Sequence, residues 1–157
     1  MRLTSTAFQQ ASSIPIKCTC DGENVSPALS WKGAPPKTKS FALIMHDPDA
    51  PRAGGYIHWV LYNIPADVAA LQPNLPQAEH IAGLCAQGKN DSGRVGYTGP
   101  CPPSGTHRYI FRLYALDTEL NLKPGASHQQ ARETMRGHIL EQTELMGTYA
   151  GISAKAA

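Results

Sequence analysis

Charge is scarce in this sequence of 157 residues. Charged residues make up 17% of it, against roughly a quarter in an average globular protein, and the formal net charge is only +2. Lysines and arginines occur in scattered pairs, such as Lys37 and Lys39, and not in runs. Because nucleic acid is bound through clusters of basic residues, we expect no nucleic-acid partner.

Long apolar runs are also lacking. No stretch approaches the ~18 consecutive apolar residues that cross a membrane. Residues 1–8 lack the apolar core of a secretion signal. We therefore expect a cytoplasmic protein with no membrane span.

Cysteine is limited to four residues, Cys18, Cys20, Cys85 and Cys101. In the cytoplasm we expect them to be mostly reduced. The Cys18–Cys20 spacing is too short for a zinc knuckle, and the other two are isolated, which disfavours a zinc site. Cys101 either packs in its loop or lies near Cys20, so the pairing of these two residues stays open. Our interpretation includes no cofactor.

Proline and glycine are plentiful, with 13 and 14 residues, which indicates a loop-rich globular domain. We find no internal repeat and no linker, and expect one domain over residues 1–157. Apolar runs at 40–46, 56–62 and 109–116 predict strands. In the second run, alternation places Ile57, Trp59 and Leu61 on one face. The fold class is mainly β, antiparallel, with a few peripheral short helices.

Weaker signals predict the remaining elements. We expect edge or short strands near 2–8, 29–31, 81–86 and 140–149, and a helical turn at 67–71. One helix begins after Ser127, a candidate N-cap with Gln130 at capping-box spacing. Ala131, Met135 and Ile139 then repeat every four residues as an apolar stripe, and Gly137 is either tolerated within this helix or ends it early.

A stiff loop of prolines and glycines, residues 96–105, precedes the strand at 109–116 and delivers His107 and Tyr109. If 41–46 pairs antiparallel with 57–62, Asp47 lies beside His58. One sheet edge then collects Asp47, His58, His107 and Tyr109 around this loop.

This combination is a plausible way to build a small-ligand pocket. An alternative is a metal-dependent hydrolase or other enzyme, because one Asp and two His also resemble a metal triad. A further alternative is a Cys101 nucleophile with His107 as its base.

Several neighbours of these residues have plainer interpretations. Trp31 and Trp59 are expected in the core. Asp49 is expected to be more structural than Asp47, since Asx residues before proline cap turns. Arg108 is expected to pair with a carboxylate beneath the loop.

Several segments together resemble the phosphatidylethanolamine-binding protein family, in its bacterial Raf-kinase-inhibitor-like branch. The resemblance runs from about residue 3 to about residue 149, nearly the whole chain. It rests on Cys20–Pro27, Leu29–Trp31, Asp47–Pro51, His58-Trp59 and the segment Gly99-Pro100-Cys101-Pro102-Pro103-x-Gly-x-His107-Arg108-Tyr109.

The resemblance implies a β-sandwich-like fold with a surface pocket for phosphate or a phosphoryl head group. Asp47, His58, His107 and Tyr109 would line it, with Gly99 and Pro100 supplying backbone. In such a pocket protonated histidines would donate to phosphoryl oxygens, and Asp47 would favour their charged form. Backbone N–H groups of the glycine-rich loop would add an anion-binding nest. The resemblance also implies a non-enzymatic protein that can modulate a kinase or another partner protein, which the sequence does not identify. Bacterial relatives often form dimers, so a homodimer is a further expectation.

Overall fold

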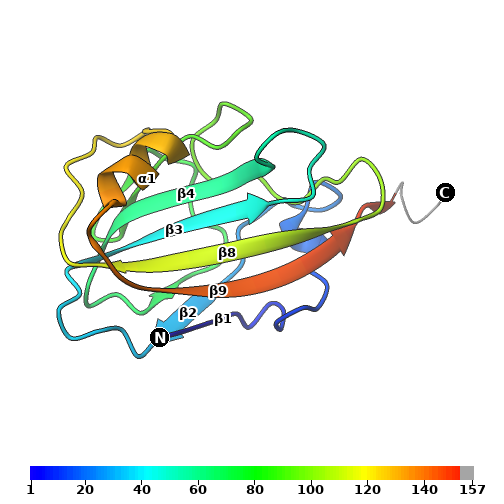
Figure 1. Cartoon of the computed structure of the whole chain (residues 1–157). Coiled ribbons are helices and arrows are strands. Elements are labelled where there is room, and N and C mark those ends of the chain that lie inside the picture. Colours follow the sequence, from blue (N-terminus) through cyan, green and yellow to red (C-terminus); the bar gives the residue numbers. More distant parts are fainter. Residues whose placement is uncertain (153–157) are drawn as a thin grey trace.

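Two antiparallel sheets stack face to face in the computed structural model, which describes residues 1–152 (Figure 1). The larger sheet has the strand order β6-β7-β4-β3-β8-β9, and the smaller has the order β1-β2-β5. The strands are β1 (Arg2–Thr4), β2 (Leu29–Lys32), β3 (Ser40–Asp47), β4 (Tyr56–Pro65), β5 (Ala70–Leu71), β6 (His80–Ile81), β7 (Cys85–Gln87), β8 (Thr106–Leu116) and β9 (Ile139–Ala150). The mainly β, antiparallel fold class is confirmed.

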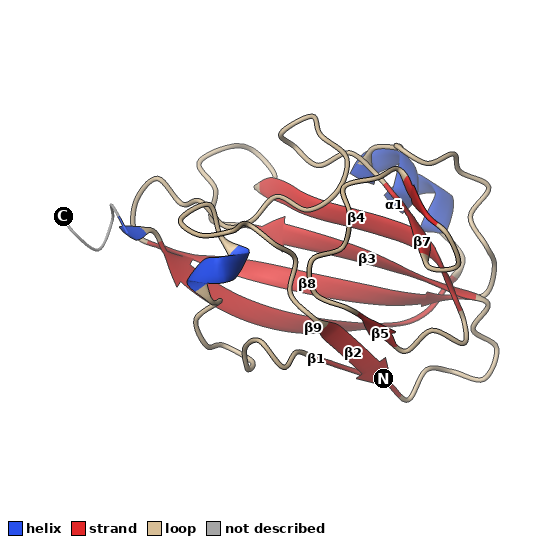
Figure 2. Cartoon of the chain, turned by 180° about the vertical axis from the view of Figure 1, so that it is seen from behind, coloured by secondary structure: helices blue, strands red, loops and turns tan. Residues whose placement is uncertain are grey.

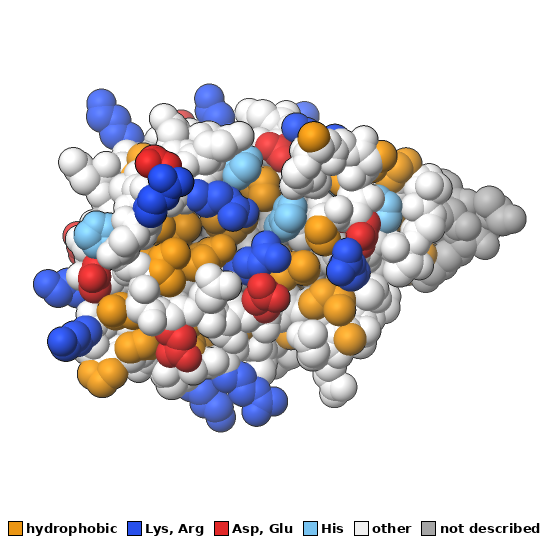
Figure 3. Space-filling view, in the orientation of Figure 1, with side chains coloured by type: hydrophobic (Ala, Val, Ile, Leu, Met, Phe, Trp, Pro, Cys, Tyr) orange, Lys and Arg blue, Asp and Glu red, His pale blue; other side chains and the backbone are white. Residues whose placement is uncertain are grey.

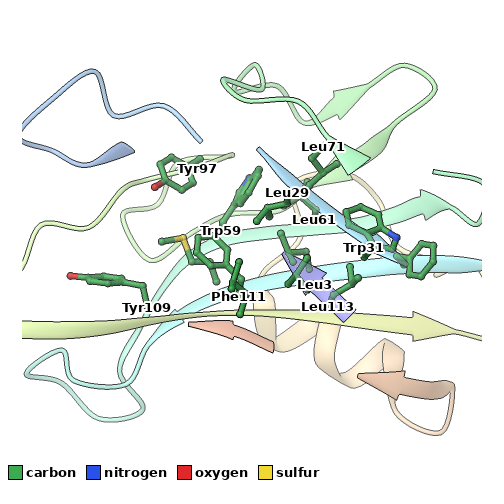
Figure 4. Close-up of a cluster of buried hydrophobic side chains, with 14 of the residues drawn as sticks. Leu3, Leu29, Trp31, Trp59, Leu61, Leu71, Tyr97, Tyr109, Phe111 and Leu113 are labelled. Atoms are coloured by element: carbon green, nitrogen blue, oxygen red, sulfur yellow. The ribbon is translucent and has the colours of Figure 1, made fainter. Parts of the chain in front are cut away.

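The main core lies between the two sheets. Seen from behind, the smaller sheet covers the face of the larger one that is opposite α1 (Figure 2). Apolar side chains from both sheets point toward one another there (Figure 4). Trp59 is fully buried and Trp31 is 4% exposed, so the expectation that both belong to the core is confirmed. Burying such large aromatics is a main source of stability in a sandwich of this size.

A second core lies under α1 (His128–Met135), on the outer face of the larger sheet. The predicted capping box is present: Gln130 N donates to Ser127 Oγ at 3.2 Å, and Ser127 N donates to Gln130 Oε1 at 3.0 Å. Ala131 and Met135 are buried as the stripe predicts. Ile139 was wrongly placed on this stripe, because the helix stops before Gly137, which has φ +81°, and Ile139 begins β9.

A β-bulge in β4 changes which residues share a face. Met45 of β3 pairs with Trp59, but the next residue, His46, pairs with Ile57. His58 is therefore an extra residue on the bulged strand, with no partner opposite it. The predicted alternation is wrong at this point, because Ile57 packs in the core under α1 while Trp59 packs between the sheets.

Two short elements also differ from the prediction. The segment 67–71 contains strand β5 rather than a helical turn, because Ala70 and Leu71 pair with β2. The single strand expected at 81–86 is a two-stranded hairpin of β6 and β7, with Gly83 at its turn. A 3-10 helix, η1 (Ile16–Cys18), precedes the loop that reaches the pocket.

The surface is mixed in charge on the face that Figure 3 shows, where acidic and basic side chains are interspersed among apolar ones. Within residues 1–152, no helix combines the length and the apolar character needed to cross a membrane.

Candidate functional site

A pocket of about 350 Å³ lies at the end of the larger sheet, where β3 ends and where β4 and β8 begin. The antiparallel pairing of these neighbouring strands brings the three ends together, as the sequence predicts. The lining residues are Asp47, Ala50, Pro51, Arg52, Tyr56, His58, Thr98, Gly99, Cys101, Pro102, Pro103, His107 and Tyr109.

Asp47, the last residue of β3, orients one histidine of the pocket. Its carboxylate is 3% exposed, and both oxygens are engaged. Oδ2 accepts a hydrogen bond from His107 Nδ1 at 2.7 Å, and Oδ1 accepts one from Asp49 N at 2.8 Å. A buried carboxylate needs such partners to remain charged. His107, the second residue of β8, is thus held by an acidic neighbour, as predicted.

His58 enters the pocket from the bulge in β4. Its Nδ1 donates to the carbonyl oxygen of Thr98 at 2.7 Å, and Thr98 N donates back to the His58 carbonyl at 3.1 Å. The ring packs between Tyr56 and Tyr109, with centroid distances of 4.7 and 5.3 Å. Burial is the main cause that lowers the pKa of His58, and the hydrogen bond to the Thr98 carbonyl and the charge of Asp47 only partly oppose it.

Tyr109 forms an inner wall between the two histidines. Its ring stacks near His107 at 6.4 Å and meets His58 edge-on. The side chain is fully buried, and its hydroxyl has no hydrogen-bond partner among the described residues. Burial, followed by the charge of Asp47, raises the pKa of this phenol, so it stays neutral.

The proline-rich loop is tied to the N-terminal segment. Gly99 N donates to Asn24 Oδ1 at 2.8 Å, so this N–H is not available to an anion. Pro100 does not line the pocket; its carbonyl instead accepts from Cys20 N at 3.1 Å. The backbone N–H of Cys101, a lining residue, has no hydrogen-bond partner within residues 1–152. If this loop supplies a backbone donor, Cys101 is the better candidate.

Cys20 and Cys101 form a disulfide, which corrects the expectation of mostly reduced cysteines. The two residues meet because the loop packs on the segment after η1, although they lie 81 positions apart. A disulfide sulfur has no thiolate, so Cys101 is not the nucleophile that we considered. Cys18 and Cys85 are free and buried, and burial raises the pKa of both thiols, that of Cys85 to about 12.

Arg108 pairs with a carboxylate, as expected. Its Nε and Nη2 bind the two oxygens of Asp49 at 3.0 and 2.8 Å, and its backbone N–H donates to the same carboxylate at 2.8 Å. These bonds lower the pKa of Asp49 to about 2. Asp49 thereby joins the β3–β4 loop to the start of β8, outside the pocket lining.

Tyr56 and Arg52 line the pocket, although they are not predicted as site residues from the sequence. The Arg52 guanidinium lies over the Tyr56 ring at 5.6 Å, and Nη1 lies 4.0 Å from Asp91 Oδ2. Tyr56 stands two residues before His58, which is the only sequence signal that pointed to it. Arg52 brings the one side chain of fixed positive charge among the lining residues.

The metal alternative finds no ligand cluster in the described part of the chain. Within residues 1–152, no three or more His, Cys, Asp or Glu side chains are arranged to hold a metal ion together. Both oxygens of Asp47 and the Nδ1 atoms of His58 and His107 already have protein partners.

Together, the fold and the site define a class: antiparallel sandwich proteins with an aspartate and two histidines in a pocket at one end of the larger sheet. The phosphatidylethanolamine-binding protein family model matches residues 4–150. The chain therefore belongs to the phosphatidylethanolamine-binding protein family.

Relatives and solved structures agree with this assignment. The chain is 54% identical to a UPF0098 protein of Methanothermobacter thermautotrophicus, covering 95% of this chain and 98% of the relative. A putative phosphatidylethanolamine-binding protein homolog from Chlamydia trachomatis matches at a TM-score of 0.87 and 42% identity, with 95% and 96% of the two chains covered. The structure of E. coli YbcL matches at a TM-score of 0.86 and 32% identity, with 96% of this chain and 98% of YbcL covered.

Proposed function

We propose that this protein binds a small anion, phosphate or a phosphoryl head group, in the pocket at the end of the larger sheet. Membership of a family named for a phospholipid supports a ligand-binding role. The observation that carries the proposal is that His58 and His107 both line the pocket and both pack against Tyr109, with His107 hydrogen-bonded to the buried Asp47.

The charge of the pocket fits this ligand. Asp47 accepts a hydrogen bond from His107 Nδ1 and so fixes the orientation of this ring, whose Nε2 remains for a ligand. Arg52 adds a guanidinium at the rim, and its contact with Tyr56 leaves it half exposed. The N–H of Cys101 is a further donor. At about 350 Å³ the pocket also has room for a substituent on the phosphate.

Calorimetric titration of phosphate and phosphoethanolamine tests the proposal. We expect His58→Ala and His107→Ala to weaken binding at least tenfold, which is about 1.4 kcal/mol. His80→Ala is the matched control, because His80 is exposed on β6 and lies outside the pocket. Unchanged affinity in both pocket variants would overturn the proposal.

A binding role without catalysis is part of the proposal. Its support is that the candidate nucleophile Cys101 is held in a disulfide. The alternative, a metal-dependent hydrolase or other enzyme using Asp47, His58 and His107, is tested by elemental analysis of the purified protein. Stoichiometric zinc or iron that is lost on substituting these residues would favour the enzyme.

We further propose that the protein modulates a kinase or another partner protein. It would do so as a single domain that forms a homodimer, and its location would be the cytoplasm. Pulldown with wild-type and His58→Ala protein separates partner binding from ligand binding, and light scattering reports the oligomer. Cell fractionation tests the location. Because disulfides are rare in a reducing cytoplasm, the Cys20–Cys101 disulfide makes a more oxidising compartment the alternative outcome of this test.

A further inference from the structure

The hydrogen bond from His58 to Thr98 shows which ring nitrogen of His58 carries a hydrogen. Nδ1 lies 2.7 Å from the carbonyl oxygen of Thr98. A carbonyl oxygen only accepts hydrogen bonds, so Nδ1 must carry the hydrogen. In the neutral ring the other nitrogen, Nε2, then has a lone pair and no hydrogen. Neutral His58 therefore offers an acceptor, and not a donor, to whatever occupies the pocket.

Nε2 of His58 is the ring atom that remains for a ligand. It has no hydrogen-bond partner among the described residues. It is also not among their polar side-chain atoms that are completely buried without a partner, so a ligand can reach it. The ring itself lines the pocket. An oxyanion placed against this atom would bring lone pair against lone pair, which is repulsive unless a proton lies between them.

His107 differs from His58 in its partner. Its Nδ1 faces the Asp47 carboxylate, which balances a positive charge on the ring, whereas His58 has only a neutral carbonyl at that place. His58 is the ring that must gain a proton when an oxyanion binds.

The groups around His58 oppose one another in their effect on its protonation, so a bound anion can change it. Burial disfavours its charged form, Asp47 on β3 and Asp91 in the loop after β7 favour it, and His46 on β3 opposes it. The uncharged rings of Tyr56 and Tyr109 pack against it. An anion within hydrogen-bond distance adds the negative charge that these neighbours only partly supply.

We propose that the pocket takes up its oxyanion together with one proton, which is held between His58 Nε2 and a ligand oxygen. A phosphate monoester is the ligand class that fits, because its monoanion carries an acidic proton and its second pKa is about 6. The monoanion of a phosphate monoester thus brings the proton itself, whereas binding of its dianion or of a sulfate ester takes the proton from the buffered solution. This inference rests on the proposed function.

The experiment is calorimetric titration of methyl phosphate and methyl sulfate between pH 5.5 and 8. Each titration is repeated in two buffers of different ionisation enthalpy, which gives the number of protons taken up. At pH 8 we expect uptake of about one proton with either ligand, and affinity that falls about tenfold per pH unit. At pH 5.5 methyl phosphate takes up fewer protons than methyl sulfate, because it arrives largely protonated.

Two variants locate the proton. His58→Gln keeps a polar side chain that does not titrate, and we expect residual binding without proton uptake. His80→Gln removes an exposed histidine far from the pocket and retains the uptake. If His58→Gln does not fold, nitrogen NMR shifts of His58 in the wild-type protein supply the same answer, because ligand addition at pH 8 must convert the ring to its protonated form.

The outcomes separate this inference from the proposed function. If neither oxyanion binds at any pH, the proposed function fails and the inference falls with it. If oxyanions bind at pH 8 without proton uptake, or if His58→Gln still takes up one proton, the proposed function stands and the inference is overturned.

Discussion

Gly99 shows how closely a single residue fits in the pocket wall. A Cβ at this position would lie 2.3 Å from the carbonyl oxygen of Cys18 and 2.4 Å from Asn24 Oδ1. No side-chain contact occurs at such distances, and the first of these atoms belongs to backbone. Glycine at position 99 is therefore required by the close approach of two chain segments, and not by an unusual backbone conformation.

We expect Gly99→Ala to lower the free energy of unfolding by about 1–3 kcal/mol, the usual cost of overpacking. It should also weaken oxyanion binding, because Gly99 and Cys101 belong to the same pocket wall. Urea denaturation and phosphate titration measure the two effects. Ser104→Ala is the control in the same loop, since Ser104 is exposed. Gly99→Ala with wild-type stability would contradict the packing described above.

Residues of the site were predictable from sequence to the extent that strand order places them. Asp47, His58, His107 and Tyr109 stand at the ends of three confidently predicted strands, and the three ends meet. The hydrogen bond between His58 and Thr98 was not predictable, because it depends on how the 96–105 loop folds back. The loss of the Gly99 N–H to Asn24 depends on the same contact.

At the scale of elements, the bulge in β4 and the disulfide are the features that build the pocket. The bulge leaves His58 without a partner in β3 and so frees it to face the pocket. Alternation in the sequence looks regular through this segment, so the bulge leaves no sequence signal. The disulfide likewise joins positions 81 residues apart, and only the folded chain shows that they meet.

The disulfide is expected to stabilise the fold chiefly by restricting the unfolded chain. For a closed loop of this size the chain-entropy model gives about 4–5 kcal/mol, while measured values are typically about 2–4 kcal/mol. We expect Cys20→Ser/Cys101→Ser to lose stability within this measured range in urea denaturation. Dithiothreitol should shift the wild-type midpoint to that of the variant and should leave the variant unchanged. A wild-type midpoint that does not respond to reduction would contradict this account.

At the scale of the whole molecule, the long elements were predictable and the short ones were not. β3, β4 and β8 are long and rich in apolar residues, and α1 has both its capping box and its buried stripe. β5, β6 and β7 have two or three residues each, and their pairing is decided by neighbours distant in sequence. Short pairings of this kind follow from tertiary packing and not from local propensity.

Buried histidines make the stability of the whole molecule depend on pH. Burial lowers the pKa of His58 and also that of His128, whose Nδ1 is buried without a partner among the described residues. The unfolded chain takes up protons at these positions as the pH falls through about 6.5, where the folded chain does not. Unfolding is thus favoured, and stability decreases as the pH drops from about 7 toward the lowered pKa values.

Asp49 adds a separate loss at lower pH. Its folded pKa of about 2 lies below the ordinary value of 3.8, so its contribution is present above about pH 4 and disappears as the pH falls toward 2. Because the pair with Arg108 is largely exposed, this contribution is at most about 1 kcal/mol.

Ligand binding should reverse the histidine effect. If the bound oxyanion shares a proton with His58, the gain in melting temperature from methyl sulfate grows as the pH falls from 8 to 6, while the ligand-free protein becomes less stable over the same range. Thermal melts with and without ligand measure both trends. His58→Gln should make the ligand-induced gain in melting temperature independent of pH. The ligand-free variant should still lose stability as the pH falls, because His128 remains. A ligand-induced gain that is constant between pH 6 and pH 8 would mean that His58 gains no proton on binding.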